Sequence, residues 1–171
     1  MLFRSNFNNE LGLPRTVLSA QADTDFLVLE MGMRGIGHIQ YLCEIAAPQV
    51  GVVLNVGTAH MELLGSREAI AAAKSEIVQS LPSDGVAVLY ADDAVVAAMA
   101  HRTSARVVTF GESPRADVRI SDVHLDENAR ARFTLTYAGE NFPVALQMVG
   151  EHQALNAAAV VAAAIAVGIE T

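Results

Sequence analysis

The fold is decided by VGVVLNVGTAHMELLGSREAIAAAKSEIVQSLPSDGVAVLY, residues 50–90. This stretch begins with one apolar run, VGVVLNVG, and ends with another, VAVLY. Between them Ser66 is typical of a helix N-cap, Glu68 lies in the first turn, and the helix is predicted to run to about Ser80. A buried strand, a helix and a second buried strand in this order predict a parallel βαβ unit.

The same alternation continues on both sides of this unit. Upstream, FLVLEMG (26–32) is typical of a buried parallel strand, and IGHIQYLCEIAAP (36–48) has apolar residues at helical spacing before a proline. Downstream, DDAVVAAMAHR (92–102) predicts a capped helix and ARVVTFG (105–111) another strand. We therefore predict an α/β fold with an open, doubly wound parallel sheet and helices on both faces.

After residue 115 the pattern changes from continuous apolar runs to alternation. ADVRISDVHLD, ARFTLTYAG and NFPVALQMVG alternate apolar and polar residues, which predicts a small antiparallel β meander at about 116–149. The alanine-rich ALNAAAVVAAAIAVGI (154–169) predicts a helix suited to close packing on a sheet. It contains Asn156 and is shorter than the ~20 residues that a membrane span needs, so we predict no membrane span.

The composition narrows the class of protein. Hydrophobic residues make up 52% of the 171 residues, as expected of a globular chain. The net charge of -8 and the pI near 5.0 argue against nucleic-acid binding, which needs a basic surface. The single cysteine, Cys43, cannot form an internal disulfide, which favours the reducing cytoplasm. The start MLFRS lacks the apolar core of a signal peptide.

Polar residues follow the first two predicted strands, where an open α/β sheet binds its ligands. Glu30 ends the run at 26–32, and Asn55 and His60 follow the run at 50–57. Glu30 is either a solvated strand end or a buried carboxylate, and the second would need a metal ion or a cation as its companion. A lone loop histidine is more often structural or solvent-exposed. His60 is a stronger candidate for a ligand-binding residue because it follows a strand and because Gly57 and Ala59 let a ligand approach the backbone closely.

Lys74 lies in a helix of small residues, with alanine at the three preceding positions. Most helix lysines point to water, and Glu76 is not at the i+4 spacing of a helix ion pair. A lysine held near its neutral form can instead react with carbon dioxide to give a carbamate, which is an anionic metal ligand. Both interpretations of Lys74 stay open on residue pattern alone.

Two loops complete the candidate features. SNFNNELGLP (5–14) is either an ordinary loop leading into a helix or a substrate-binding loop, because amide side chains both donate and accept hydrogen bonds. GMRGIG (32–37) superficially suggests a phosphate-binding glycine loop, but its spacing fits neither GxxxxGK[ST] nor GxGxxG. Neither motif occurs anywhere in the sequence.

Five segments, in the order given, resemble the Mur ligase family: NFNNELGLP, VLEMGMRGIGHI, VVLNVGTAHMELLGSREAIAAAKSEI, LPSDGVAVLYADD and VGEHQALNAAAVVAA. The resemblance covers roughly residues 5–171 and is greatest to members that join D-Ala-D-Ala to a UDP-N-acetylmuramoyl-tripeptide. It implies an ATP- and Mg²⁺-dependent ligase of cytoplasmic peptidoglycan precursor synthesis. ATP would phosphorylate the substrate carboxylate, and the amine of D-Ala-D-Ala would attack the acyl phosphate.

The resemblance also implies a role for individual residues. Glu30 matches a magnesium ligand, His60 a ligand of a second magnesium site, and Lys74 the lysine that is carbamylated to support that second metal. These three are the implied catalytic residues. Further matches are to substrate-binding and ATP-binding positions: Asn8, Asn9 and Arg34 for the substrate, Asn156 and His152 for the adenosine part of ATP.

The family's UDP-binding domain and phosphate loop would lie before residue 1, and its last domain after residue 171. The resemblance therefore implies a central-domain fragment, with a substrate-binding loop at 1–13 and a partial ATP-binding domain at 14–171. We expect this piece to be monomeric and to hydrolyse no ATP alone. The alternatives are a related ligase, either the one adding the third amino acid or folylpolyglutamate synthase, and a non-catalytic α/β scaffold domain.

Overall fold

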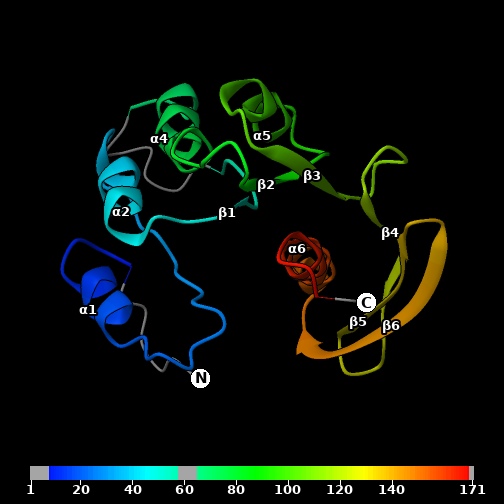
Figure 1. Cartoon of the computed structure of the whole chain (residues 1–171). Coiled ribbons are helices and arrows are strands. Elements are labelled where there is room, and N and C mark those ends of the chain that lie inside the picture. Colours follow the sequence, from blue (N-terminus) through cyan, green and yellow to red (C-terminus); the bar gives the residue numbers. More distant parts are fainter. Residues whose placement is uncertain (1–7, 58–64, 170–171) are drawn as a thin grey trace.

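The computed structural model describes residues 8–57 and 65–169. In this part of the chain six strands form one sheet, and their order across the sheet is their order along the chain (Figure 1). The strands are β1 (Val50–Val53), β2 (Val86–Tyr90), β3 (Arg106–Gly111), β4 (Val118–Leu125), β5 (Arg130–Tyr137) and β6 (Glu140–Val149). β1 to β4 pair in parallel, and β5 and β6 continue the same sheet as antiparallel strands.

Helices cover both faces of the sheet, as predicted. They are α1 (Gly12–Leu18), α2 (His38–Ala46), α4 (Arg67–Gln79), α5 (Ala94–Ala97), the 3₁₀ helix η1 (Ala98–Arg102) and α6 (His152–Ala166). In Figure 1, α4 and α5 lie above β1 to β3, α2 lies beside α4, and α6 lies on the opposite face, where the sheet curves around it from β1 to β6. The predicted α/β fold is therefore confirmed. None of the helices among the described residues is long and apolar enough to cross a membrane.

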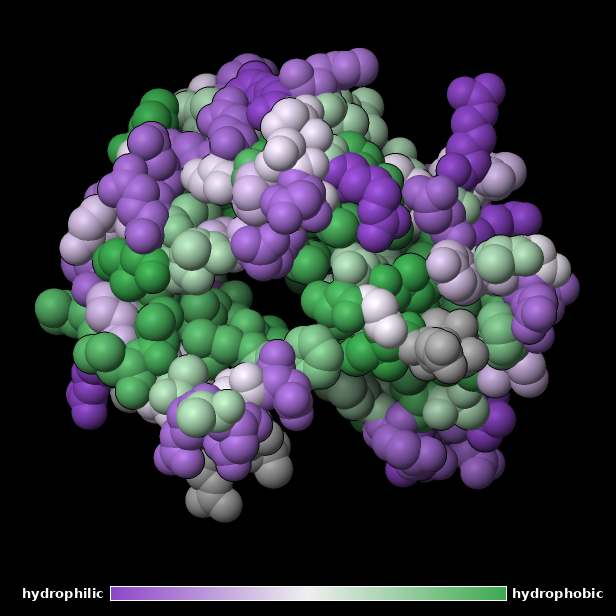
Figure 2. All heavy atoms as spheres, in the orientation of Figure 1, coloured by the Kyte–Doolittle hydropathy of each residue, from purple (hydrophilic) through white to green (hydrophobic). Residues whose placement is uncertain are grey.

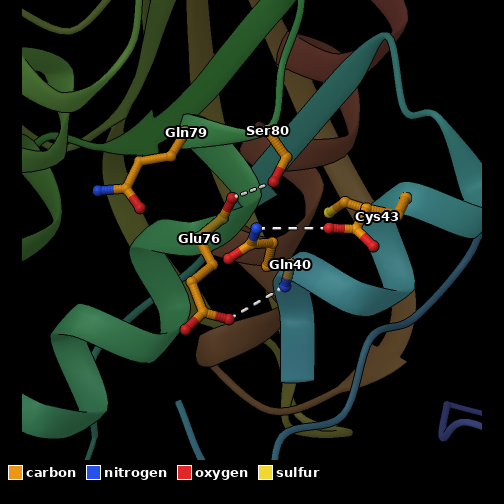
Figure 3. A pocket seen from close by; sticks show the side chains of 6 residues that line it. Gln40, Cys43, Glu76, Gln79 and Ser80 are labelled. Atoms are coloured by element: carbon orange, nitrogen blue, oxygen red, sulfur yellow. Dashed lines mark hydrogen bonds between the residues drawn. The ribbon is translucent and has the colours of Figure 1, made fainter. Parts of the chain in front are cut away.

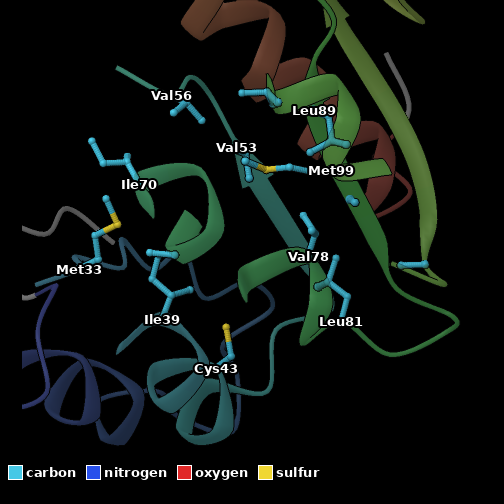
Figure 4. Packing of buried hydrophobic residues seen from close by; sticks show 14 residues of the cluster. Met33, Ile39, Cys43, Val53, Val56, Ile70, Val78, Leu81, Leu89 and Met99 are labelled. Carbon is cyan, nitrogen blue, oxygen red and sulfur yellow. The ribbon is translucent and has the colours of Figure 1, made fainter. Parts of the chain in front are cut away.

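Successive residues of β2 enter two different hydrophobic cores, because side chains alternate across a strand. Ala87 and Leu89 join the core beneath α2, α4 and η1, part of which is shown in Figure 4. Val86 and Val88 join the core beneath α6. Buried alanines of α6, among them Ala158, let that helix approach the sheet closely. The continuous apolar run of β2 is thus explained, because both faces of this strand are buried.

α4 begins where the sequence predicts. Ser66 is its N-cap, and the Ser66 hydroxyl oxygen accepts the N–H of Ala69 at 3.1 Å. Ser66→Ala should lower the free energy of unfolding by about 1 kcal/mol, because one N–H of the first turn loses its acceptor. Urea denaturation would measure this change, and Ser66→Asp, which keeps an acceptor at the cap, should retain most of the stability. Equal stability of the alanine variant and the parent would contradict this role.

The predicted strand at 26–32 does not form. Its backbone pairs with no strand of the described residues, and β1 is the edge of the sheet on that side. Phe26 is 57% exposed and Val28 81% exposed, whereas a parallel strand would be buried. Figure 2 shows an opening bordered by hydrophobic side chains between this segment and α6. An apolar run indicates a tendency to be buried, but a strand also needs a partner for its backbone.

Other boundaries move by a few residues. The loop predicted at 5–14 ends earlier, because α1 already begins at Gly12. The predicted helix at 36–48 begins at His38, after Gly37 in the left-handed region. The predicted helix at 92–102 is a single α-turn that continues as the 3₁₀ helix η1.

Candidate active site

The peptide group between Asn55 and Val56, just beyond β1, is bound by side chains at both of its polar atoms. The Asn55 carbonyl oxygen accepts from Lys74 Nζ at 2.7 Å. The Val56 N–H donates to Asp93 Oδ2 at 3.3 Å. Arg67 Nε donates to the next carbonyl, that of Val56, at 3.2 Å, and Arg67 Nη2 lies 3.3 Å from Asp93 Oδ2. The segment just beyond β1, α4 and the N-cap of α5 therefore meet at the carboxyl edge of the sheet.

Lys74 is half-buried at this edge. Burial lowers the pKa of Lys74 below the ordinary value of a lysine, and the charge of Asp93 opposes part of this effect. Burial acts in this direction because it disfavours the charged ammonium. The lowered pKa increases the fraction of neutral amine, which is the nucleophilic form of the side chain. Lys74 therefore does not simply point to water.

Asp93 is the N-cap of α5. Its Oδ1 accepts the N–H groups of Val95 at 2.9 Å and Val96 at 3.4 Å. Partial burial alone would raise the pKa of Asp93, but the main-chain N–H donors and the Arg67 charge together lower the pKa below its ordinary value. The side chain is therefore a carboxylate at neutral pH.

The neighbouring Asp92 faces the other side, toward the end of β3. Its Oδ2 accepts the Glu112 N–H at 2.6 Å. Gly111 has φ +147°, in the region that favours glycine, and a Cβ there would overlap the Asp92 carboxylate. Two adjacent aspartates after β2 thus connect the ends of the two neighbouring strands.

Glu30 and Asn8, predicted as a metal ligand and a substrate-binding residue, lie together. Asn8 Nδ2 donates to Glu30 Oε1 at 3.0 Å, and the Asn8 carbonyl accepts the Gly32 N–H at 2.7 Å. Glu30 is exposed, so of its two alternatives the buried carboxylate that needs a cation is wrong and the solvated carboxylate is confirmed. The backbone at Glu30 lies in an open segment and not inside the sheet, which leaves the carboxylate in solvent.

Asn9 and Arg34 have neighbours of their own. Asn9 Oδ1 accepts the N–H groups of Leu11 at 3.1 Å and Gly12 at 2.8 Å, which supports the start of α1. Arg34 Nη1 lies 3.5 Å from Glu10 Oε1, with 65% of the Arg34 side chain exposed. This pair connects the loop before α1 with the loop before α2.

His152 and Asn156, which the resemblance assigns to the adenosine part of ATP, lie in the first turns of α6. Gln153 connects them, with its Nε2 3.2 Å from His152 Nε2 and its Oε1 accepting from Asn156 Nδ2 at 3.1 Å. The three polar side chains form one hydrogen-bonded row on an otherwise alanine-rich helix.

The glycines of GMRGIG belong to the start of α2. Gly37 has φ +87° and no side chain with which to cap the helix. Glu76 of α4 takes this place: its Oε1 accepts the Gly37 N–H at 2.6 Å and its Oε2 the Gln40 N–H at 3.0 Å. The helix N-terminus therefore already carries an anion, which agrees with the absence of a phosphate motif in this loop.

An open hollow of about 420 Å³ lies between α2 and α4 (Figure 3). It is lined by Gln40, Cys43, Glu44, Glu76, Gln79 and Ser80. None of the described residues to which the sequence assigns chemistry lines it. The hollow is thus separate from the carboxyl edge of the sheet.

The predicted metal site is only partly within the structure. His60 lies outside the described residues. Within residues 8–57 and 65–169, no group of three or more His, Cys, Asp or Glu side chains could hold a metal ion. Glu30 offers a carboxylate oxygen, which suits Mg²⁺, whereas Lys74 suits a metal only as a carbamate, because an ammonium has no lone pair to donate.

The sequence did not single out Arg67 or the second role of Asp93. Two signals could have found them. An aspartate pair follows β2 after one intervening residue, at the same edge that drew attention to Glu30 and Asn55. Arg67 is a cation in the first turn of α4, where the helix dipole disfavours it, so another partner was to be expected.

Comparison with known proteins shows which family the chain resembles. The sequence profile of the Mur ligase middle domain matches residues 3–164. The UDP-N-acetylmuramoyl-tripeptide–D-alanyl-D-alanine ligase of Mycobacterium tuberculosis (strain ATCC 25618 / H37Rv) is 51% identical over 163 residues, which are 95% of this chain and 32% of that ligase. The chain therefore spans about a third of the length of the curated relatives it matches.

Solved structures give the same relationship. A crystal structure of MurF from Acinetobacter baumannii has a TM-score of 0.91 at 35% identity, and the match covers 98% of this chain and 36% of that one. The MurF ligase of Thermotoga maritima in complex with ADP has a TM-score of 0.86 at 32% identity, covering 98% of this chain and 39% of that one.

Proposed function

The chain belongs to the Mur ligase family, and on this premise we propose that it forms the ATP-binding central domain of a ligase that joins D-Ala-D-Ala to a UDP-N-acetylmuramoyl-tripeptide. The observation that carries this proposal is the 51% identity over 95% of the chain to a ligase of that name. The likeness to a MurF ligase in complex with ADP supports ATP as the nucleotide. The reaction would belong to peptidoglycan precursor synthesis in the cytoplasm.

We assign the metal-binding role to Glu30, His60 and a carbamylated Lys74. Bound Mg²⁺ would neutralise charge on the transferring phosphoryl oxygens. The Lys74 amine would attack carbon dioxide, forming a C–N bond and releasing one proton, to give the carbamate. The hydrogen bond to the Asn55 carbonyl holds the amine in place, and the lowered pKa keeps more of it neutral.

We assign the nucleotide and substrate roles to polar groups at two other places. His152 and Asn156 present donors and acceptors at the start of α6, which suit an adenosine. Asn8 and Arg34 lie at the loops before α1 and α2, which suit the UDP-linked peptide, while Asn9 would support α1 beneath it.

A chimera tests the proposal. The 163-residue stretch of the Mycobacterium tuberculosis ligase that aligns with this chain would be replaced by the corresponding residues of this chain. We expect release of ADP that requires both the tripeptide substrate and D-Ala-D-Ala, at a rate within about tenfold of the parent, because a domain swap at this identity preserves the core. A folded chimera without this activity, or one that hydrolyses ATP without D-Ala-D-Ala, would contradict the proposal.

A further inference from the structure

The peptide group between Asn55 and Val56 is held from two directions by charged side chains. Lys74 Nζ donates to its oxygen at 2.7 Å, and its N–H donates to Asp93 Oδ2 at 3.3 Å. A peptide group is planar, so these two atoms rotate together. Any group that fixes the N–H therefore also fixes the direction in which the oxygen points, and with it the acceptor available to Lys74.

We propose that Asp93 is a positioning residue for Lys74, acting through this peptide group. The inference rests on the proposed function, because it gives Asp93 a part in the same reaction. Asp93 does not itself contact the lysine by a hydrogen bond; it sets the plane of the peptide to which the lysine donates.

The surroundings make Asp93 suited to this task. Only 12% of its side chain is exposed, and Val56 is 3% exposed, so water competes little for the Val56 N–H. Arg67 reinforces the hold, since its guanidinium contacts both the Asp93 carboxylate and the Val56 carbonyl. The carboxylate, the guanidinium and the backbone of Val56 thus close a ring of hydrogen bonds.

The two carboxylate oxygens of Asp93 accept hydrogen bonds from two different parts of the chain. Oδ1 accepts from Val95 and Val96 at the start of α5, and Oδ2 accepts from Val56. An asparagine has one acceptor oxygen, so Asp93→Asn cannot serve both. Asparagine caps helices as well as aspartate does, so we expect its oxygen to stay with the two donors of α5 and its amide NH₂ to face the Val56 N–H.

Asp92→Asn provides the matched control. It removes the same charge from the adjacent position, but Asp92 uses a single oxygen for its hydrogen bond to the Glu112 N–H. An asparagine oxygen can replace that acceptor, so the contact to the end of β3 survives. The control thus separates the loss of the Val56 contact from the loss of one negative charge.

The first measurement is amide hydrogen exchange in the 171-residue chain. In Asp93→Asn we expect exchange at Val56 to accelerate at least tenfold, while Val95 and Val96 change less than threefold. In Asp92→Asn all three should exchange as in the parent. Unchanged exchange at Val56 in Asp93→Asn would overturn the proposal, as would equal acceleration at Val56 in both variants.

The second measurement is steady-state kinetics in the chimera. Asp93→Asn should lower kcat by about 10- to 100-fold with KM for ATP within threefold, since a misplaced catalytic group costs about this much. Asp92→Asn should keep both constants within threefold. A kcat equal to the parent, or a loss that the control shares, would overturn the positioning role. An inactive but folded parent chimera would contradict the proposed function, and the exchange measurement would still decide whether Asp93 holds the Val56 peptide.

Discussion

Lys74→Ala in the chimera is expected to lower kcat at least 100-fold. The variant removes the only lysine of the sequence and with it the amine that would carry the carbamate. Loss of a ligand that supports a catalytic metal forfeits several kcal/mol of charge stabilisation, and each 1.36 kcal/mol is a factor of ten in rate. Added formate or acetate should restore roughly tenfold, because a small carboxylate can enter the space left by the side chain.

Lys74→Arg is the informative control for this loss. Arginine keeps the positive charge and can still donate to the Asn55 carbonyl, but it stays protonated and so forms no carbamate. It should therefore be as inactive as the alanine variant. Full activity of either variant without an added carboxylate would contradict the carbamate.

The carbamate can also be observed without activity. With ¹³C-labelled bicarbonate, the 171-residue chain should show one side-chain carbamate resonance, which is absent from Lys74→Arg. Its occupancy should increase as the pH rises through the lowered pKa of Lys74, because only the neutral amine reacts. A spectrum identical for the parent and the variant would show that Lys74 stays unmodified.

Glu76→Ala should lower the free energy of unfolding by about 3 kcal/mol, which is more than we expect for Ser66→Ala. Glu76 is 7% exposed, and its removal leaves the N–H groups of Gly37 and Gln40 without their acceptor. A hydrogen bond to a charged group contributes about 1.5–3 kcal/mol, and α2 also loses the anion at its positive end. Urea denaturation monitored by circular dichroism would measure this change.

Glu44→Ala is the matched control, since Glu44 borders the same hollow but is exposed on α2. It removes the same charge and should change the stability by less than about 0.5 kcal/mol, as is usual for a surface site. A loss in Glu76→Ala no larger than that of the control would show that α2 does not need the carboxylate.

The strands and helices that formed as predicted carry local signals. β2 is a continuous apolar run, and α4 has an N-cap at Ser66 that acts within one turn. The run at 26–32 carries a strand signal too, yet it does not pair. The apolar pattern of a segment indicates which of its faces are buried. Whether the segment forms a strand also depends on a second strand that pairs with its backbone, and that strand lies elsewhere in the sequence.

The site was predictable to the extent that it follows from the sheet. Open α/β sheets bind ligands beyond the carboxyl ends of their strands, and this directed attention to Asn55, whose carbonyl accepts from Lys74. The small residues around Lys74 raised the possibility that this lysine is not fully in solvent, and Lys74 is half-buried. The contacts of Asp93 and Glu76 were not predictable, because their partners lie 37 and 39 residues away along the chain. Asp93 has a local role as the N-cap of α5, and this local role gives no sign of its second contact, with the Val56 N–H.

The sequential order of the six strands bears on how the protein is made. Each strand pairs with the strand synthesised just before it, so the sheet can grow from β1 to β6 while the chain leaves the ribosome. α6 contacts all six strands and follows them all. Until α6 has emerged, the apolar face that includes Val88 and Phe110 stays uncovered. We infer that this late interval is when the nascent chain most needs protection by chaperones from aggregation.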